Sequence, residues 1–114
     1  MAFEYDVKNE SGYDIIYLKG NLMEKHEAQA MLGEINEMVE QGHNKFLLHL
    51  KDLKYMNSSG LNVLIQLLTK TRTSGGDSVI CHVSKKVNDL LIITKLNTLF
   101  KVADTKEDAM KLLG

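Results

Sequence analysis

The sequence contains no proline, and no stretch of it is rich enough in glycine and serine to act as a flexible linker. It also lacks internal repeats and low-complexity tracts. Its 114 residues are enough for one compact domain and too few for two. We therefore expect residues 1–114 to form a single domain.

Cysteine occurs only once, at Cys81, so an internal disulfide is excluded and a reducing compartment is favoured. The net charge is −1, so the chain lacks the excess of positive charge that is typical of nucleic-acid-binding proteins. The residues after Met1 lack the basic start and apolar core of a signal peptide, and no apolar run is long enough to span a membrane. These absences predict a cytoplasmic protein that does not bind nucleic acid directly and does not insert into a membrane.

Two spacings of apolar residues alternate along the chain, one typical of strands and one typical of helices. Alternating apolar residues predict a strand over residues 3–8, and a run rich in isoleucine and tyrosine predicts a second strand over 13–19. The turn residues between them predict an antiparallel hairpin. Three further strands are predicted at 45–50, 78–83 and 99–102, the last of them at an edge.

Helices are predicted between and after these strands. The loop over residues 20–23 leads to a helix that ends near Gly42, and a central helix ends near Thr73. Ser84 is expected to cap a third helix and Thr105 a fourth. The order β-β-α-β-α-β-α-β-α predicts an α/β fold, with a mixed, mostly parallel sheet packed against about four helices.

The most informative stretch lies between the 45–50 strand and the central helix. Asn57, Ser58 and Ser59 are residue types that cap a helix by accepting hydrogen bonds from its first free N–H groups. Gly60 has no side chain, so we expect another molecule to approach the first turn closely. The free N–H groups and the helix dipole at such a place favour a phosphate.

The segment that runs from Lys51 to Leu61 closely resembles the signature of the anti-sigma-factor antagonists, the STAS domains. That signature is a strand, an aspartate, a few residues, and then Asp-Ser-Ser/Thr-Gly-Leu at the start of a helix. Further segments of the chain resemble the family at residues 20–22, 78–84, 92–102 and 107–109. The resemblance implies that Ser58 is phosphorylated by a partner kinase.

By this resemblance the chain is a binding module, not an enzyme, and needs no cofactor. Its unphosphorylated form would bind an anti-sigma factor that is also a serine kinase and so free a sigma factor. Phosphorylation on Ser58 would release it, and a PP2C-type phosphatase would reset it. The residues expected to bind the partner or support the site are Asn57, Ser59, Gly60, Met56, Leu61, Met23 and Glu24.

Two positions depart from the family pattern: Asn57 replaces its usual aspartate, and Met23 stands where another aspartate is usual. Met23 and Met56 flank the expected site, where they could form an adaptable partner surface or pack in the core. The alternative function is a STAS subunit without a switch, part of a transport assembly (for example for lipids) or a signalling assembly.

The sequence gives weaker support to a metal site or a hydrolase site. His49 and His82 fall on two inner strands and could be neighbours, but strand alternation points Cys81 to the opposite face from His82. A three-ligand metal site is therefore not expected. There is no Gly-x-Ser-x-Gly elbow of a hydrolase, and Gly75-Gly76 is interpreted as a turn.

Overall fold

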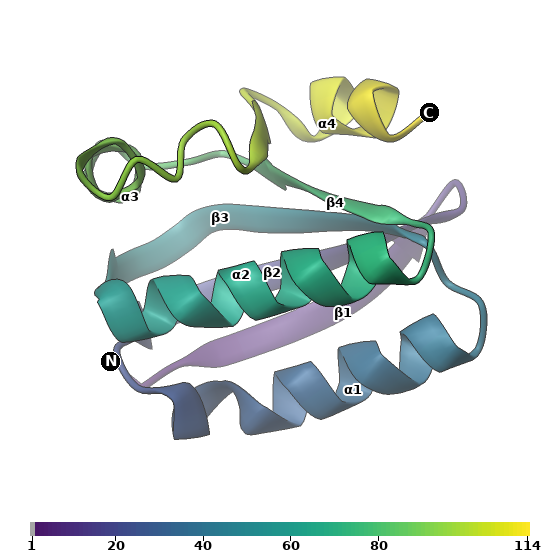
Figure 1. The fold of residues 1–114 in the computed structure, drawn as a ribbon, viewed down its shortest axis with the longest axis horizontal. Helices are drawn as coiled ribbons and strands as arrows, with labels where there is room; N and C mark the ends of the chain where they lie inside the picture. Colours follow the sequence, from purple (N-terminus) through teal and green to yellow (C-terminus); the bar gives the residue numbers. More distant parts are fainter. Residues whose placement is uncertain (1) are drawn as a thin grey trace.

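The computed structural model describes residues 2–114, and these form a five-stranded mixed sheet with helices on both faces (Figure 1). The strands are β1 (Glu4–Glu10), β2 (Tyr13–Leu22), β3 (Lys45–Met56), β4 (Asp77–Cys81) and β5 (Lys101–Ala103). The helices are the short 3₁₀ helix η1 (Lys25–Ala28), α1 (Gln29–Glu40), α2 (Ser58–Thr73), α3 (Lys85–Ile93) and α4 (Lys106–Leu113). The sheet order is β1-β2-β3-β4-β5, with β1 antiparallel to β2 and the other pairs parallel. The predicted fold class is confirmed.

The sheet separates two apolar layers. One face of β2, β3 and β4 packs with side chains of α1, α2 and α3 in the larger core, while the other face packs under α4. Figure 1 shows α1 and α2 running side by side, with α4 away from both. Successive side chains of a strand point to opposite faces, so a strand buried on both faces needs a continuous apolar run. The run from Phe46 to Leu48 on β3 meets this requirement.

The predicted local signals hold at the first hairpin and at the helix caps. Gly12 has a φ of 86°, which the tight turn between β1 and β2 requires and glycine adopts at little cost. Ser84 accepts a hydrogen bond from the Val87 N–H at 3.2 Å, and Thr105 accepts one from the Asp108 N–H at 3.1 Å. Both side chains cap the helices that they precede.

Two strands are longer than predicted. Residues 20–22 were expected to form a loop, but they extend β2 and pair with β3, where Gly20 lies opposite Leu53 and Leu22 opposite Met56. β3 runs to Met56 instead of ending at Leu50. The pairing contains register shifts beside Lys19 and Gly20, and it is this partner strand that holds the polar segment after Leu50 in an extended conformation.

β4 is shorter than predicted, and its end corrects a second expectation. The strand ends at Cys81, and His82 adopts a φ of 54°, outside the extended region. The alternation of side chains is lost at that residue, so the inference that His82 and Cys81 point to opposite faces is wrong. Their side chains lie together, as described below.

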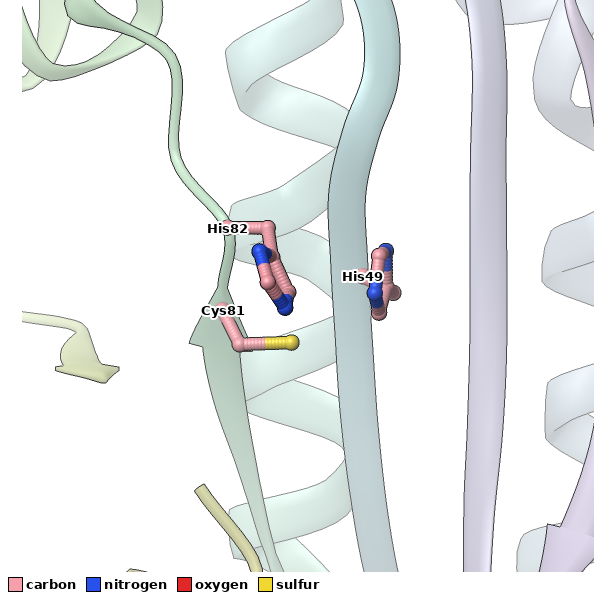
Figure 2. Close-up of side chains that lie close together, drawn as sticks. All are labelled: His49, Cys81 and His82. Atoms are coloured by element: carbon pink, nitrogen blue, oxygen red, sulfur yellow. The ribbon is translucent and has the colours of Figure 1, made fainter. Parts of the chain in front are cut away.

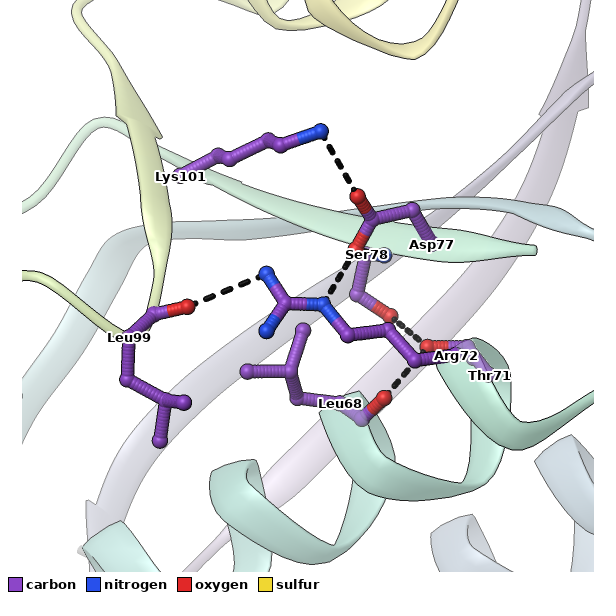
Figure 3. Close-up of polar contacts among 7 residues, drawn as sticks. All are labelled: Leu68, Thr71, Arg72, Asp77, Ser78, Leu99 and Lys101. Carbon is purple, nitrogen blue, oxygen red and sulfur yellow. Dashed lines mark hydrogen bonds and ion pairs between the residues drawn. The ribbon is translucent and has the colours of Figure 1, made fainter. Parts of the chain in front are cut away.

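A polar network joins the end of α2 to β4 and β5 (Figure 3). Asp77 accepts a hydrogen bond from Arg72 Nε at 3.0 Å and pairs with Lys101 Nζ at 2.9 Å. Arg72 also donates to the Leu99 carbonyl. Burial by itself would raise the pKa of Asp77, but hydrogen bonds from Lys101, the Ser78 N–H and Arg72 hold that pKa below its ordinary value.

Within residues 2–114, no helix is both long and apolar enough to cross a lipid bilayer.

Candidate functional site

The candidate site is the first turn of α2, directly after β3. Asn57 is the N-cap residue, and its side-chain oxygen accepts a hydrogen bond from the Gly60 N–H at 3.0 Å. The Asn57 carbonyl accepts the first helical bond, from the Leu61 N–H at 2.9 Å. A helix leaves its first four N–H groups without helical partners, so this cap satisfies one of them. Asn57 thus performs the capping role that the sequence suggested for the whole Asn-Ser-Ser group.

Ser58 and Ser59 are the first two residues of α2, and both are exposed. Among the side-chain hydrogen bonds of the described residues, none involves either hydroxyl. Since Asn57 supplies the cap, both hydroxyls remain free at the positive end of the helix dipole. They are accessible to a modifying enzyme without any rearrangement of the cap.

Gly60 has a different role from the one predicted. It is buried, and a Cβ atom at this position would lie 2.1 Å from the Leu22 carbonyl oxygen and 2.7 Å from Met56 Cγ. The close approach that requires glycine is therefore made by the end of β2, not by another molecule. This contact fixes the first turn of α2 against β2.

The other predicted site residues divide into buried and exposed groups. Leu61 is only 2% exposed and Met56 packs against the larger core, so both support the site from below. Met23 is 40% exposed, and Glu24 is exposed beside it. The Glu27 side chain accepts hydrogen bonds from the backbone N–H groups of Met23 and Glu24, which fixes this loop at the start of η1.

Sequence reasoning missed three residues of this surface. Lys25 of η1 lines the same shallow hollow as Ser59. Tyr55, at the end of β3, is 52% exposed, and Lys86 of α3 lies over its ring at 4.2 Å and donates to its hydroxyl at 3.1 Å. Lys25 is brought next to the serine pair by the packing of η1 against α2, so no sequence pattern could have predicted this neighbour.

The first turn of α2 carries no acidic residue. Lys25 lines the same hollow as Ser59, and the positive end of the helix dipole lies at this turn, so each of these two features favours an anion. A phosphate at Ser58 would meet no carboxylate within that turn.

The model of the STAS domain family matches residues 5–109, which run from the second residue of β1 through β5 and include the first turn of α2. The chain belongs to the STAS domain family. The match confirms the resemblance seen in the sequence.

Relatives within this family are named for one regulatory activity. A Thermotoga maritima protein named as a candidate anti-sigma factor antagonist is 32% identical over 76 residues, which are 67% of this chain and 67% of that protein. The anti-sigma F factor antagonist of Paenibacillus polymyxa is 25% identical over 111 residues, which cover 96% of this chain and 94% of the relative. The chain is thus a STAS domain similar to anti-sigma factor antagonists.

The fold is also similar to solved structures of the anti-sigma factor antagonist SpoIIAA. The unphosphorylated form matches with a TM-score of 0.78 at 19% identity, over 94% of this chain and 93% of the other. The phosphorylated form, from Bacillus, matches with a TM-score of 0.74 at 18% identity, over 97% of this chain and 100% of the other. At these identities the likeness shows a common fold.

The STAS motif does not account for a second cluster, on the sheet face opposite α2. His49 lies opposite Cys81 in the β3–β4 pairing, and the ligand atoms of His49, Cys81 and His82 all lie within 4.8 Å of one another (Figure 2). The two imidazole rings stack at 4.4 Å between centroids, as their predicted neighbourhood suggested. Burial raises the pKa of the Cys81 thiol to about 12. Burial and the nearby His82 lower the pKa of His49, so its ring is neutral at pH 7.

Proposed function

We propose that this STAS domain is an anti-sigma factor antagonist switched by phosphorylation of Ser58. Its unphosphorylated form binds an anti-sigma factor that is also a serine kinase, and this binding frees a sigma factor. The kinase transfers a phosphate from ATP to Ser58, the module dissociates, and a PP2C-type phosphatase resets it. The module acts by binding, without catalysis of its own, and the cytoplasm is its expected compartment.

The observation that carries this proposal is the exposed Ser58 hydroxyl on a helix that Asn57 already caps. A serine that capped the helix itself would lose that hydrogen bond on phosphorylation, and the modification would then disturb the fold. Here the cap and the phosphoacceptor are different residues. Modification can therefore change the surface while the fold stays intact.

The physical basis of the switch is the charge of the phosphate. A phosphoserine carries about −1.5 to −2 charges at pH 7 and three acceptor oxygens. In the free module the helix N-terminus and solvent accommodate that charge. In the complex the same dianion would be desolvated against a surface that fits a neutral hydroxyl, which is costly. Affinity therefore falls although the fold does not change.

The exposed residues near the first turn of α2 include types that protein interfaces favour. Met23 and Tyr55 offer exposed apolar area, Lys25 lines the hollow beside Ser59, and Lys86 lies over the Tyr55 ring. Aromatic residues and methionine are enriched in such interfaces. Met23 and Glu24 are the predicted partner contacts, whereas Gly60, Leu61 and Met56 hold the turn in place.

The experiment is a pull-down from the native cell with the parent domain, Ser58→Ala, Ser58→Asp and Ser59→Asp as baits. The parent and Ser58→Ala should recover an anti-sigma factor with kinase activity, and ATP should release the parent but not Ser58→Ala. Ser58→Asp should bind that partner at least tenfold more weakly, a loss of about 1.4 kcal/mol. Tandem mass spectrometry should place a single phosphate on Ser58.

The Ser59→Asp variant adds the same charge one residue further along the same turn and tests how strongly the effect depends on position 58. Because Ser59 belongs to the same expected binding surface, this variant should lose affinity too, but less than Ser58→Asp. A phosphate found on Ser59 alone would contradict the assignment of Ser58. Equal binding of all four baits, insensitive to ATP, would instead favour a STAS subunit without a switch.

A further inference from the structure

Two of the three side chains of the second cluster come from neighbouring strands, the third comes from the residue just after β4, and all three lie close together. His49 is in the middle of β3, and Cys81 ends β4 directly opposite it. The positive φ of His82 turns its side chain back toward the same face, which an extended residue would not do. Figure 2 shows the Cys81 sulfur pointing toward β3, with both rings beside it.

The two clustered imidazoles differ from the other two histidines of the chain. His43 Nδ1 lies 2.6 Å from an Asp14 carboxylate oxygen, and His26 Nδ1 lies 3.2 Å from one of Glu24. Within residues 2–114, no hydrogen bond or ion pair to a protein group is formed by His49 or His82. Both rings are half-buried, so their nitrogens are available to a ligand that reaches the cluster from solvent.

We propose that His49, Cys81 and His82 form a binding site for one divalent transition-metal ion of the Zn²⁺ class. Two imidazole nitrogens and a thiolate are the donor types that Zn²⁺ and Co²⁺ prefer, whereas Mg²⁺ and Ca²⁺ prefer oxygen donors. Three protein ligands leave a fourth tetrahedral position for water. His82 also lines a groove with Lys51, Ser84 and Asp104, which brings solvent to one edge of the cluster.

The distances fit such an ion after a small movement. Bond lengths of about 2.0–2.1 Å to nitrogen and 2.3 Å to sulfur place tetrahedral ligand atoms about 3.3–3.6 Å apart. The present separations reach up to 4.8 Å, and the stacked rings are inclined by 28°. Closing this difference requires the two half-buried rings to turn, and His49 must do so against Tyr17, whose ring centroid lies 4.8 Å from its own. On binding, an Sγ–metal bond replaces the Sγ–H bond of Cys81, and the released proton passes to the buffer.

Charged groups of both signs lie near the cluster. Lys51, Lys106 and the carboxylate of Asp52 influence the pKa of His49, and Glu107 and Lys106 influence that of Cys81. Lys106 is itself paired with Glu10 at 3.0 Å. The surroundings therefore do not repel a dication strongly, and the Cys81 thiolate neutralises part of its charge. The ion would link the middle of β3 to the end of β4.

The test is a titration of the purified, reduced domain with Co²⁺, followed by competition with Zn²⁺. Cys81 is the only cysteine of the chain, so any thiolate-to-cobalt charge-transfer band reports this residue alone. We expect that band, together with the visible bands of tetrahedral Co²⁺, to saturate at one ion per chain and to disappear on addition of Zn²⁺. His49→Gln and His82→Gln should each weaken binding at least tenfold, and Cys81→Ser should abolish the charge-transfer band.

His26→Gln is the matched control, because it removes a histidine outside the cluster and should leave the titration unchanged. Circular dichroism shows whether each variant is folded. If Cys81→Ser misfolds, the two glutamine variants decide the question, since their side chains are only half-buried. Absence of the thiolate band would overturn the proposal. So would binding that survives both glutamine substitutions or that depends on His26.

Discussion

At the scale of single residues, Gly60 couples the candidate site to the sheet. Its missing side chain allows the Leu22 carbonyl at the end of β2 to contact the first turn of α2. The sequence motif alone suggested that this space was reserved for a partner. The structure shows that it is occupied by the chain itself, so the glycine is a packing requirement of the fold.

Gly60→Ala should therefore destabilise the domain. A Cβ at 2.1 Å from a backbone oxygen forces the helix or β2 to move, and overpacking of this kind costs about 1–3 kcal/mol. Urea unfolding followed by circular dichroism measures the loss. Gly33→Ala in α1 is the matched control, since its added Cβ would meet no atom within 4 Å apart from the backbone of its own helix and its chain neighbours. That variant should gain up to about 1 kcal/mol from helix propensity. Equal effects of the two substitutions would contradict the contact with Leu22.

At the scale of elements, α2 shows which features local signals can predict. Its apolar face, its end at Thr73 and its cap follow from residue types and their spacing. The ends of β2 and β3 do not follow from such signals. Residues 20–22 contain turn-forming types, and residues 51–54 alternate poorly, yet each strand extends because the other supplies its hydrogen bonds. Pairing between distant segments overrides weak local preference.

The cap of α2 gives a prediction at this scale. Asn57→Ala removes the acceptor of the Gly60 N–H and should lower the free energy of unfolding by about 1 kcal/mol, within a range of 0.5–2. Asn57→Asp keeps a side-chain oxygen and should retain most of the stability at pH 7. Thermal unfolding of the three proteins at one pH measures the difference. A Ser58→Ala variant as unstable as Asn57→Ala would show that the serine, not the asparagine, caps the helix.

At the scale of the whole molecule, the Asp77 network connects three elements that are distant in the sequence. Its carboxylate, with 22% of the side chain exposed, joins Arg72 of α2 to Lys101 of β5. Edge strand β5 has only three residues, so these ion pairs add to the few backbone bonds that hold it. The network also fixes the loop before β5 through Arg72 and the Leu99 carbonyl (Figure 3).

Asp77→Asn should lower the free energy of unfolding at pH 7 by about 1–2 kcal/mol. Because the pKa of Asp77 is lower in the folded state, the unfolded state binds more protons in the acid range. The stabilisation that the Asp77 carboxylate provides is therefore complete above its unfolded-state pKa of about 3.9. It is lost as the pH falls through the pKa that Asp77 has in the folded state. Urea midpoints at pH 7 and about pH 3 should show the difference between parent and variant shrinking in acid. Asp104→Asn, at an exposed loop position, should show neither effect.

The sequence by itself determined the element order, the helix caps, the mixed sheet and the position of the Asn57-Ser58-Ser59-Gly60 motif. These depend on short-range periodicity and on residue types that act on their immediate neighbours. The tertiary structure alone decided that the Leu22 carbonyl occupies the space where a side chain at residue 60 would lie. It also decided that Lys25 lies beside Ser59 and that His82 turns toward Cys81. Each of these depends on where a distant segment packs or on one backbone angle, and a pattern of residue types encodes neither.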